Sequence, residues 1–70
     1  MSNTIKLTKS EKYIFSNYIY INKKIANNTY NEWVDKELHT YVLTEIYIRY
    51  GSETSNLFKA KFEKYLSLAK

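Results

Sequence analysis

The chain lacks cysteine and proline, and it contains a single glycine, Gly51, and a single histidine, His39. Without cysteine, disulfides and thiolate metal sites are excluded, and one histidine is too few for a zinc site of the usual kind. We therefore expect no metal and no cofactor. The scarcity of proline and glycine favours long uninterrupted elements, most simply helices, and it excludes glycine-rich phosphate loops.

A catalytic constellation is also missing from the sequence. A nucleophile with an oriented base requires Ser or Cys together with His and a carboxylate. His39 is the only base of this kind, and it lies between Leu38 and Thr40 inside a predicted helix. A lone helical histidine is more often a surface or interface residue than a catalyst. We therefore expect that the protein is not an enzyme.

The length of 70 residues permits one domain, spanning 1–70. So short a chain buries only ~60% of its unfolded surface, so a lone core is marginally stable. Oligomerisation is the remaining compensation in a chain without disulfides or metal, and we predict a homodimer. Aromatic residues make up 17% of the chain, 8 of them tyrosine, which predicts a folded rather than a disordered protein.

The charge balance is modestly basic, with 11 Lys and Arg against 7 Asp and Glu, a net charge of +4. This balance permits nucleic acid or an acidic protein as partner. The N-terminus has no apolar run of signal-peptide length. The most apolar stretch, 41–48, is far shorter than the ~20 residues that span a bilayer. We expect a cytoplasmic protein without membrane association.

Residues 4–8 alternate between polar and apolar side chains, the period of a half-buried strand. Ile5 and Leu7 would share one face of that strand. Thr4, Lys6 and Thr8 would share the other. The run predicts a short N-terminal β-strand, with a frayed extended tail as the alternative.

Three helices are predicted after the strand, which makes the fold mainly α. Thr8–Glu11 has the spacing of a capping box and begins a helix over about 9–27, and Thr29–Glu32 has the same spacing and begins a second over about 30–50. Residues 41–50 are also rich in β-branched and aromatic side chains, so a strand competes with helix there. Gly51 suits the end of the second helix, and a third is expected over about 53–69. Helical spacing predicts a core of Ile14, Tyr18, Ile21, Ile25, Val34, Leu38, Val42, Phe58 and Phe62.

The excess of aromatic residues has two interpretations. Exposed aromatic rings stack on bases in single-strand binders, whereas buried ones supply core and interface area. Because helical spacing places most of them on apolar stripes, we favour core and interface. Four tyrosines fit the stripes least well and are candidates for exposed contact with a protein: Tyr13, Tyr20, Tyr47 and Tyr50.

An alternating strand, a helix, an Asn-rich turn and a second helix together resemble the ribbon-helix-helix family of transcriptional repressors, over roughly residues 3–50. In that family two chains pair their strands into a ribbon that enters the major groove of DNA. The resemblance implies base contacts from Thr4, Lys6 and Thr8. It implies a phosphate site at Asn28, Thr29 and Tyr30, and a third helix as an addition. The chain departs from the family in its longer first helix and in a turn without the common glycine.

Two functions are therefore expected. The first is a small basic regulator, from a phage, virus or plasmid, that binds double-stranded DNA. The alternative is a small phage or plasmid protein that binds a host protein as an inhibitor or adaptor, for example an inhibitor of a CRISPR nuclease or of host polymerase. The alternative rests on size and composition, since no motif supports it.

Overall fold

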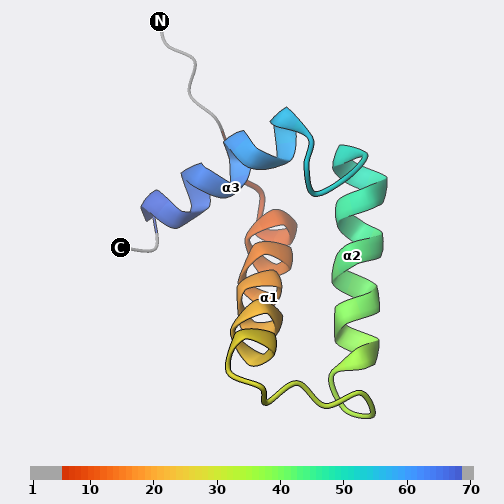
Figure 1. The fold of residues 1–70 in the computed structure, drawn as a ribbon. Helices are drawn as coiled ribbons and strands as arrows, with labels where there is room; N and C mark the ends of the chain where they lie inside the picture. Colours follow the sequence, from red (N-terminus) through yellow and green to blue (C-terminus); the bar gives the residue numbers. More distant parts are fainter. Residues whose placement is uncertain (1–5, 69–70) are drawn as a thin grey trace, which may run out of the picture.

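The computed structural model describes residues 6–68, which fold into three helices (Figure 1). These are α1 (Lys9–Ala26), α2 (Lys36–Tyr50) and α3 (Asn56–Leu68). α1 and α2 form an antiparallel hairpin, and α3 crosses the end of the hairpin at which α1 begins and α2 ends. The predicted three-helix, mainly α architecture is confirmed.

The start of α1 follows the predicted capping box. The Thr8 hydroxyl accepts a hydrogen bond from the Glu11 N–H at 3.1 Å, and Glu11 Oε1 accepts from the Thr8 N–H at 3.0 Å. Both donors belong to the first turn, where no intrahelical partner exists. α1 ends one residue earlier than predicted, and Asn28 then takes a left-handed conformation with φ of 58°.

The start of α2 differs from the prediction, because the second capping box does not form. The Thr29 hydroxyl instead donates to the Lys24 carbonyl at 3.3 Å. The Asn31 side chain accepts from the N–H groups of Trp33 and Val34, at 2.7 and 3.0 Å. These bonds hold a turn over 31–35, and the helix begins only at Lys36. From there to Tyr50 the chain is helical throughout, so the competing strand at 41–50 is wrong.

The predicted N-terminal strand has no support in the described part of the chain. No strand occurs within 6–68, and Thr8, although extended, serves as the N-cap of α1. Thr4 and Ile5 lie outside the described residues. α3 begins at Asn56 rather than 53, because the Ser55 hydroxyl caps it by accepting from the Phe58 N–H at 3.0 Å.

The core lies where the three helices meet. Phe15 is fully buried, and its ring lies 5.6–6.0 Å from the rings of Tyr50, Phe58, Phe62 and Tyr65. Ile14, Val42 and Ile46 complete the cluster. Of the predicted core residues, Ile14, Ile21, Val42 and Phe58 are buried, whereas Tyr18, Leu38 and Phe62 are partly buried.

Two predicted core residues are exposed. Val34 is 72% exposed because it lies in the turn before α2 rather than inside the helix. Ile25 is 46% exposed because it lies in the last turn of α1, at the end of the hairpin that α3 does not cover (Figure 1). Helical spacing finds the correct side of a helix, but it does not tell how far the neighbouring helix extends.

A buried carboxylate joins all three helices. Glu11 Oε2 accepts hydrogen bonds from the Tyr50 hydroxyl at 2.7 Å and from Lys61 Nζ at 2.8 Å. Burial disfavours the charged form of Glu11, but bonds from Lys61, the Thr8 backbone and Tyr50 outweigh it and lower its pKa to about 2. Tyr50 is therefore buried, and its predicted role as an exposed interface residue is wrong.

Candidate functional site

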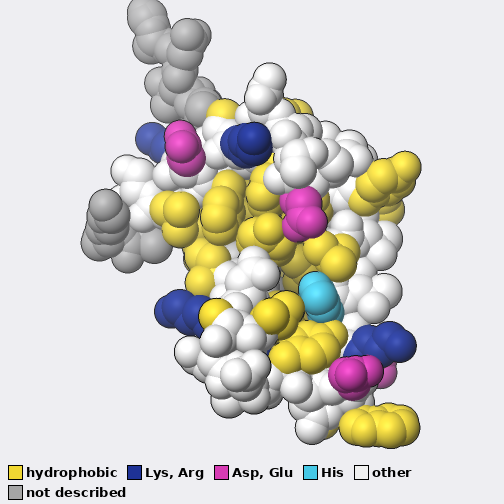
Figure 2. All heavy atoms as spheres, viewed as in Figure 1, with side chains coloured by type: hydrophobic (Ala, Val, Ile, Leu, Met, Phe, Trp, Pro, Cys, Tyr) yellow, Lys and Arg dark blue, Asp and Glu magenta, His cyan; other side chains and the backbone are white. Residues whose placement is uncertain are grey.

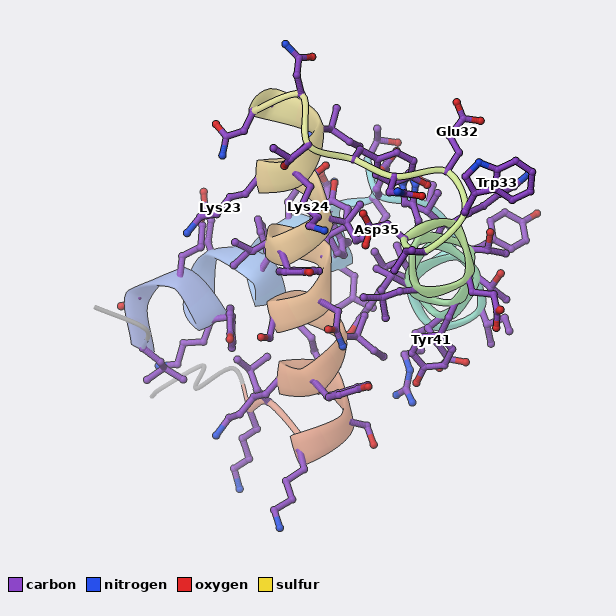
Figure 3. All side chains as sticks on the ribbon, turned by 90° about the horizontal axis from the view of Figure 1, so that it is seen from below. Lys23, Lys24, Glu32, Trp33, Asp35 and Tyr41 are labelled. Carbon is purple, nitrogen blue, oxygen red and sulfur yellow. The ribbon has the colours of Figure 1, made fainter. Side chains whose placement is uncertain are left out.

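Within residues 6–68, large apolar side chains are exposed on all three helices and on the loop between α1 and α2. Figure 2 shows hydrophobic side chains gathered over the middle of one face, between α1 and α2. The most exposed large apolar side chain in the described part of the chain is Trp33, at 92%, in the loop that joins these two helices. Figure 3 shows its indole pointing away from the helix bundle. An isolated exposed aliphatic residue needs no explanation, but a fully presented tryptophan is rare enough to indicate a site.

Hydrogen bonds hold the loop that carries Trp33. The Asn31 side chain accepts from the N–H groups of Trp33 and Val34. The Asp35 carboxylate accepts from the Asn31 N–H at 2.9 Å and from Lys24 Nζ of α1 at 3.0 Å. Hydrogen bonds of Asn31 and Asp35 therefore hold the turn at both of its ends, and the bond from Lys24 joins it to α1.

Asp35 is the buried centre of this arrangement, with only 4% of its surface exposed. The hydrogen bond from the Asn31 backbone and then that from Lys24 outweigh burial and lower the pKa of Asp35. The hydrogen bond to the Asp35 carboxylate, with a smaller contribution from the Tyr20 side chain, raises the pKa of Lys24. Both partners are therefore charged at neutral pH, and the tie between the loop and α1 persists there.

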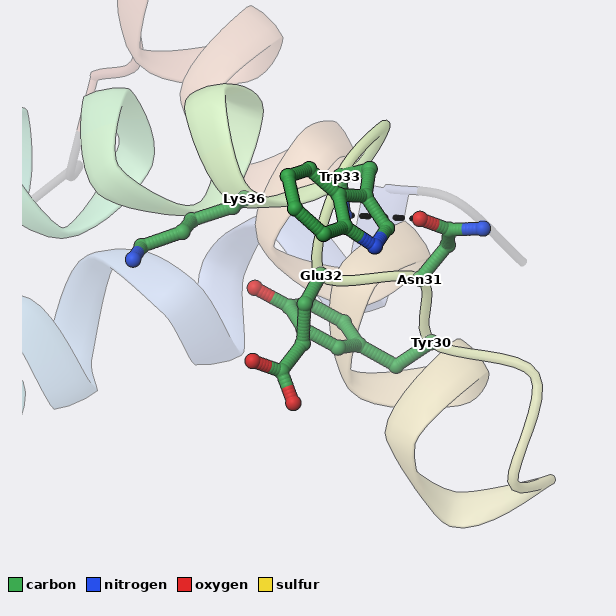
Figure 4. Close-up of a pocket in the computed structure, with 5 residues that line it drawn as sticks. All are labelled: Tyr30, Asn31, Glu32, Trp33 and Lys36. Carbon is green, nitrogen blue, oxygen red and sulfur yellow. Dashed lines mark hydrogen bonds between the residues drawn. The ribbon is translucent and has the colours of Figure 1, made fainter.

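A shallow recess lies beside the indole (Figure 4). Tyr30, Asn31, Glu32, Trp33 and Lys36 line it. The Tyr30 hydroxyl shares a hydrogen bond of 3.0 Å with Nδ1 of His39, and the two rings meet edge to face. This contact fixes the aromatic wall of the recess. Glu32 and Lys36 add one charge of each sign, so the recess can accept a partner's apolar group with polar contacts at its rim.

The predicted protein-contact tyrosines fall in different places. Tyr13, Tyr20 and Tyr47 are exposed at 58%, 47% and 70%. Tyr13 meets Tyr41 of α2 edge to face, with ring centres 6.4 Å apart. Tyr20 lies under Lys24 Nζ, 5.2 Å from the ring centre, which is a cation–π contact. These three side chains remain available for contact, whereas Tyr50 does not.

Those residues predicted to bind DNA that fall within 6–68 lie toward opposite ends of α1. Lys6 is exposed, whereas the Thr8 hydroxyl is used by the cap of α1. Thr4 lies outside the described residues. Asn28, Thr29 and Tyr30 lie at the far end of α1, and α2 begins six positions beyond Tyr30, at Lys36. No helix starts over 28–30, so the helix terminus on which the predicted phosphate site depended lies elsewhere.

Trp33 was not predicted as a functional residue. It fell inside the helix predicted over about 30–50 and was not among the predicted core residues of that helix, so nothing marked it as a presented side chain. The signal lies in its neighbours: Asn31, Glu32 and Asp35 are residues typical of turns and helix starts. A large aromatic residue inside such a segment indicates a presented side chain rather than a core one.

Within the described residues, no helix is long and apolar enough to cross a membrane. No three acidic or histidine side chains in residues 6–68 gather closely enough to hold a metal ion. No protein-family model, curated protein or solved structure matches the chain, so its function is argued from its own residues.

Proposed function

We propose that the protein acts by binding another protein, as an inhibitor or adaptor, and that Trp33 is the central contact. The observation that carries the proposal is a 92% exposed indole on a loop whose backbone is held by Asn31 and Asp35. Tryptophan is the residue type most enriched among side chains that dominate binding energy. A loop already fixed in the free protein loses little conformational entropy on binding.

The rest of the surface supports the same class of function. Exposed large hydrophobic side chains occur on all three helices and on the loop, Leu57 and Leu68 of α3 among them. Where such side chains adjoin, as the exposed rings of Tyr13 and Tyr41 do, they form the kind of apolar surface that another macromolecule covers. The net charge of +4 favours a partner that is acidic overall.

The test is recovery of a partner from cells that make the protein, with Trp33→Ala compared against Tyr47→Ala. Tyr47 is a matched control because it is also aromatic and 70% exposed, but it lies near the opposite end of α2. We expect Trp33→Ala to abolish recovery and Tyr47→Ala to preserve it. Recovery that survives Trp33→Ala and is lost with Tyr47→Ala would contradict the role of Trp33.

A direct signal accompanies that comparison, because Trp33 is the only tryptophan in the chain. Its emission reports on one position without interference. Titration with the recovered partner, or with a tryptophan-free fragment of it, should shift the emission to the blue as the indole leaves water. An unchanged emission at saturation would show that the partner binds elsewhere.

Binding to DNA remains a second candidate, and one observation favours it. Three exposed lysines, Lys6, Lys9 and Lys12, lie at the start of α1, where the positive helix terminus already attracts anions. A mobility shift on duplex DNA across a salt series separates the two functions. The regulator requires an affinity that falls steeply with salt and that Lys6→Ala weakens. Binding no tighter than that of any protein with a charge of +4 favours the protein-binding function.

A further inference from the structure

α2 is apolar on more sides than its neighbours in the chain cover. Val42, Ile46 and Tyr50 face the core and are buried. Tyr41, Leu43, Tyr47 and Ile48 lie on other sides of the same helix and are 38–70% exposed. A helix that is apolar all round is normally covered all round. In residues 6–68, α1 and α3 cover only one side, so a further surface is needed for the rest.

One flank of α2 has a regular pattern. Tyr41 and Ile48 are seven residues apart, and Val34, in the turn just before the helix, continues the spacing. We call Val34, Tyr41 and Ile48 the outer flank; their exposures are 72%, 44% and 69%. Within a helix, a seven-residue repeat keeps side chains along one line that faces a partner helix, and Tyr41 and Ile48 of α2 meet this condition. Val34 precedes the helix, in a turn closed by a hydrogen bond from the Asp35 N–H to the Asn31 carbonyl at 2.8 Å. Figure 3 shows that the side chains of Tyr41 and Trp33 point in different directions.

We propose that the outer flank binds the outer flank of a second copy, with the two α2 helices antiparallel. Val34 and Ile48 lie at equal distances before and after Tyr41. A twofold axis at Tyr41 therefore places Tyr41 against its own counterpart, and it places Val34 against Ile48 in both halves of the interface. This is the self-complementary arrangement that a symmetric dimer requires.

The charges beside the flank are compatible with this pairing. At 100° per residue, Glu37 and Glu45 border the flank on opposite edges of α2. A twofold axis across the two helices keeps each edge on its own side of the dimer. Glu45 then lies beside Leu38 of the second copy, and Glu37 lies beside Thr44, so the carboxylates do not oppose each other. Glu45 is also held by Arg49 of its own chain at 3.0 Å.

The available area reaches about the minimum that a specific pair requires. Tyr13, packed against Tyr41, extends the outer flank onto α1. At about 200 Å² for a full side chain of this size, the exposed fractions of these four residues leave roughly 500 Å² per copy. Two copies would bury roughly 1,000 Å², which is about the minimum for a specific interface. A second copy also supplies the stabilisation that a small chain without disulfides needs.

Sedimentation of the full chain tests the interface with a matched pair of variants. Ile48 and Tyr47 are adjacent and equally exposed, at 69% and 70%, but they lie on different sides of α2. Ile48→Lys should weaken dimerisation by at least about tenfold, because it places a charge in an apolar contact. Tyr47→Lys should leave the dimer unchanged. Circular dichroism of both variants checks that the helices persist.

Single cysteines test the register, because the natural chain contains none. Under mild oxidation, Tyr41→Cys should form a crosslinked dimer by itself. Val34→Cys alone and Ile48→Cys alone should not, whereas a mixture of these two variants should crosslink. Crosslinking of Val34→Cys alone would indicate a parallel pair and overturn the proposed register.

The inference does not depend on the proposed function. Trp33→Ala should abolish partner binding and leave the dimer intact. Ile48→Lys should weaken the dimer and leave Trp33 exposed for partner binding. A monomer of 8.4 kDa at high micromolar concentration would overturn the inference. Equal effects of Ile48→Lys and Tyr47→Lys on sedimentation would do the same.

Discussion

Replacement of Glu11 by glutamine tests the contact on which the three helices converge. Glu11 accepts from the Thr8 N–H through Oε1, and from Tyr50 and Lys61 through Oε2. Glutamine keeps one acceptor oxygen and replaces the other by an amide donor. At least one of the three donors is then unmatched, and the bond to Lys61 loses its charge.

The size of the effect follows from these bonds. An unmatched buried donor costs about 1–3 kcal/mol, and a neutral acceptor binds a charged donor about 1 kcal/mol more weakly than a carboxylate does. We expect Glu11→Gln to lower the free energy of unfolding by about 2–3 kcal/mol. For a domain of this size that amounts to a decrease in melting temperature of about 10–20 °C. Tyr50→Phe is the control, because it removes one bond and leaves the carboxylate charged; we expect about 1 kcal/mol.

The pH dependence distinguishes a charged Glu11 from a merely well-packed one. Its pKa falls from 4.5 to about 2 on folding, so its contribution is complete above pH 4.5 and is lost as the pH falls from there toward 2. Thermal unfolding followed by circular dichroism should show the full difference in stability between the natural chain and Glu11→Gln at pH 7, and a much smaller difference in stability near pH 2. Other carboxylates titrate in both proteins and cancel in the difference. An equal difference in stability at pH 7 and near pH 2 would refute the reasoning.

Three further outcomes are expected. Phe15→Ala removes the ring at the centre of the aromatic cluster and should cost about 3–5 kcal/mol in chemical denaturation, while Leu57→Ala, on the surface of α3, should stay within about 0.5 kcal/mol. Gly51→Ala should cost about 1–2 kcal/mol of stability, because Gly51 has φ of 92°, which strains an alanine backbone. A Cβ added there would meet no atom within 4 Å, so steric contact adds nothing to that cost. Gly51→Asn should cost less. Acrylamide should quench Trp33 in the free protein nearly as strongly as in the unfolded chain, and strong protection would contradict its exposure of 92%.

The helices were predictable from sequence because their determinants are local. The capping box at Thr8 needs only residues within one turn, and it forms as predicted. The same spacing at Thr29 fails because longer-range bonds compete. Asp35 pairs with Lys24 eleven residues away, and Asn31 uses its side chain for the turn. A short motif therefore predicts a helix start only where its residues do not form hydrogen bonds with other parts of the protein.

The candidate site was less predictable, since exposure depends on what the neighbouring helices reach. Tyr50 seemed available from its position, but α3 and Glu11 enclose it. Trp33 seemed part of a helix, and the six-residue delay in the start of α2 places it on the surface instead. The N-terminal strand was expected to pair with the strand of a second chain, and within 6–68 Thr8 instead caps α1. Local periodicity contains none of this information.

Glu11 divides its two oxygens between local and tertiary structure, and this division links two events that would otherwise be separate. Oε1 completes the first turn of α1, while Oε2 holds α2 and α3. When α3 moves away, the carboxylate gains water and rotational freedom, and the cap weakens with it. Fraying of α1 and release of α3 should therefore form one cooperative opening unit. In native-state hydrogen exchange, the first-turn amides of α1 and the amides of α3 would share a single opening free energy, despite lying about 50 residues apart in the chain.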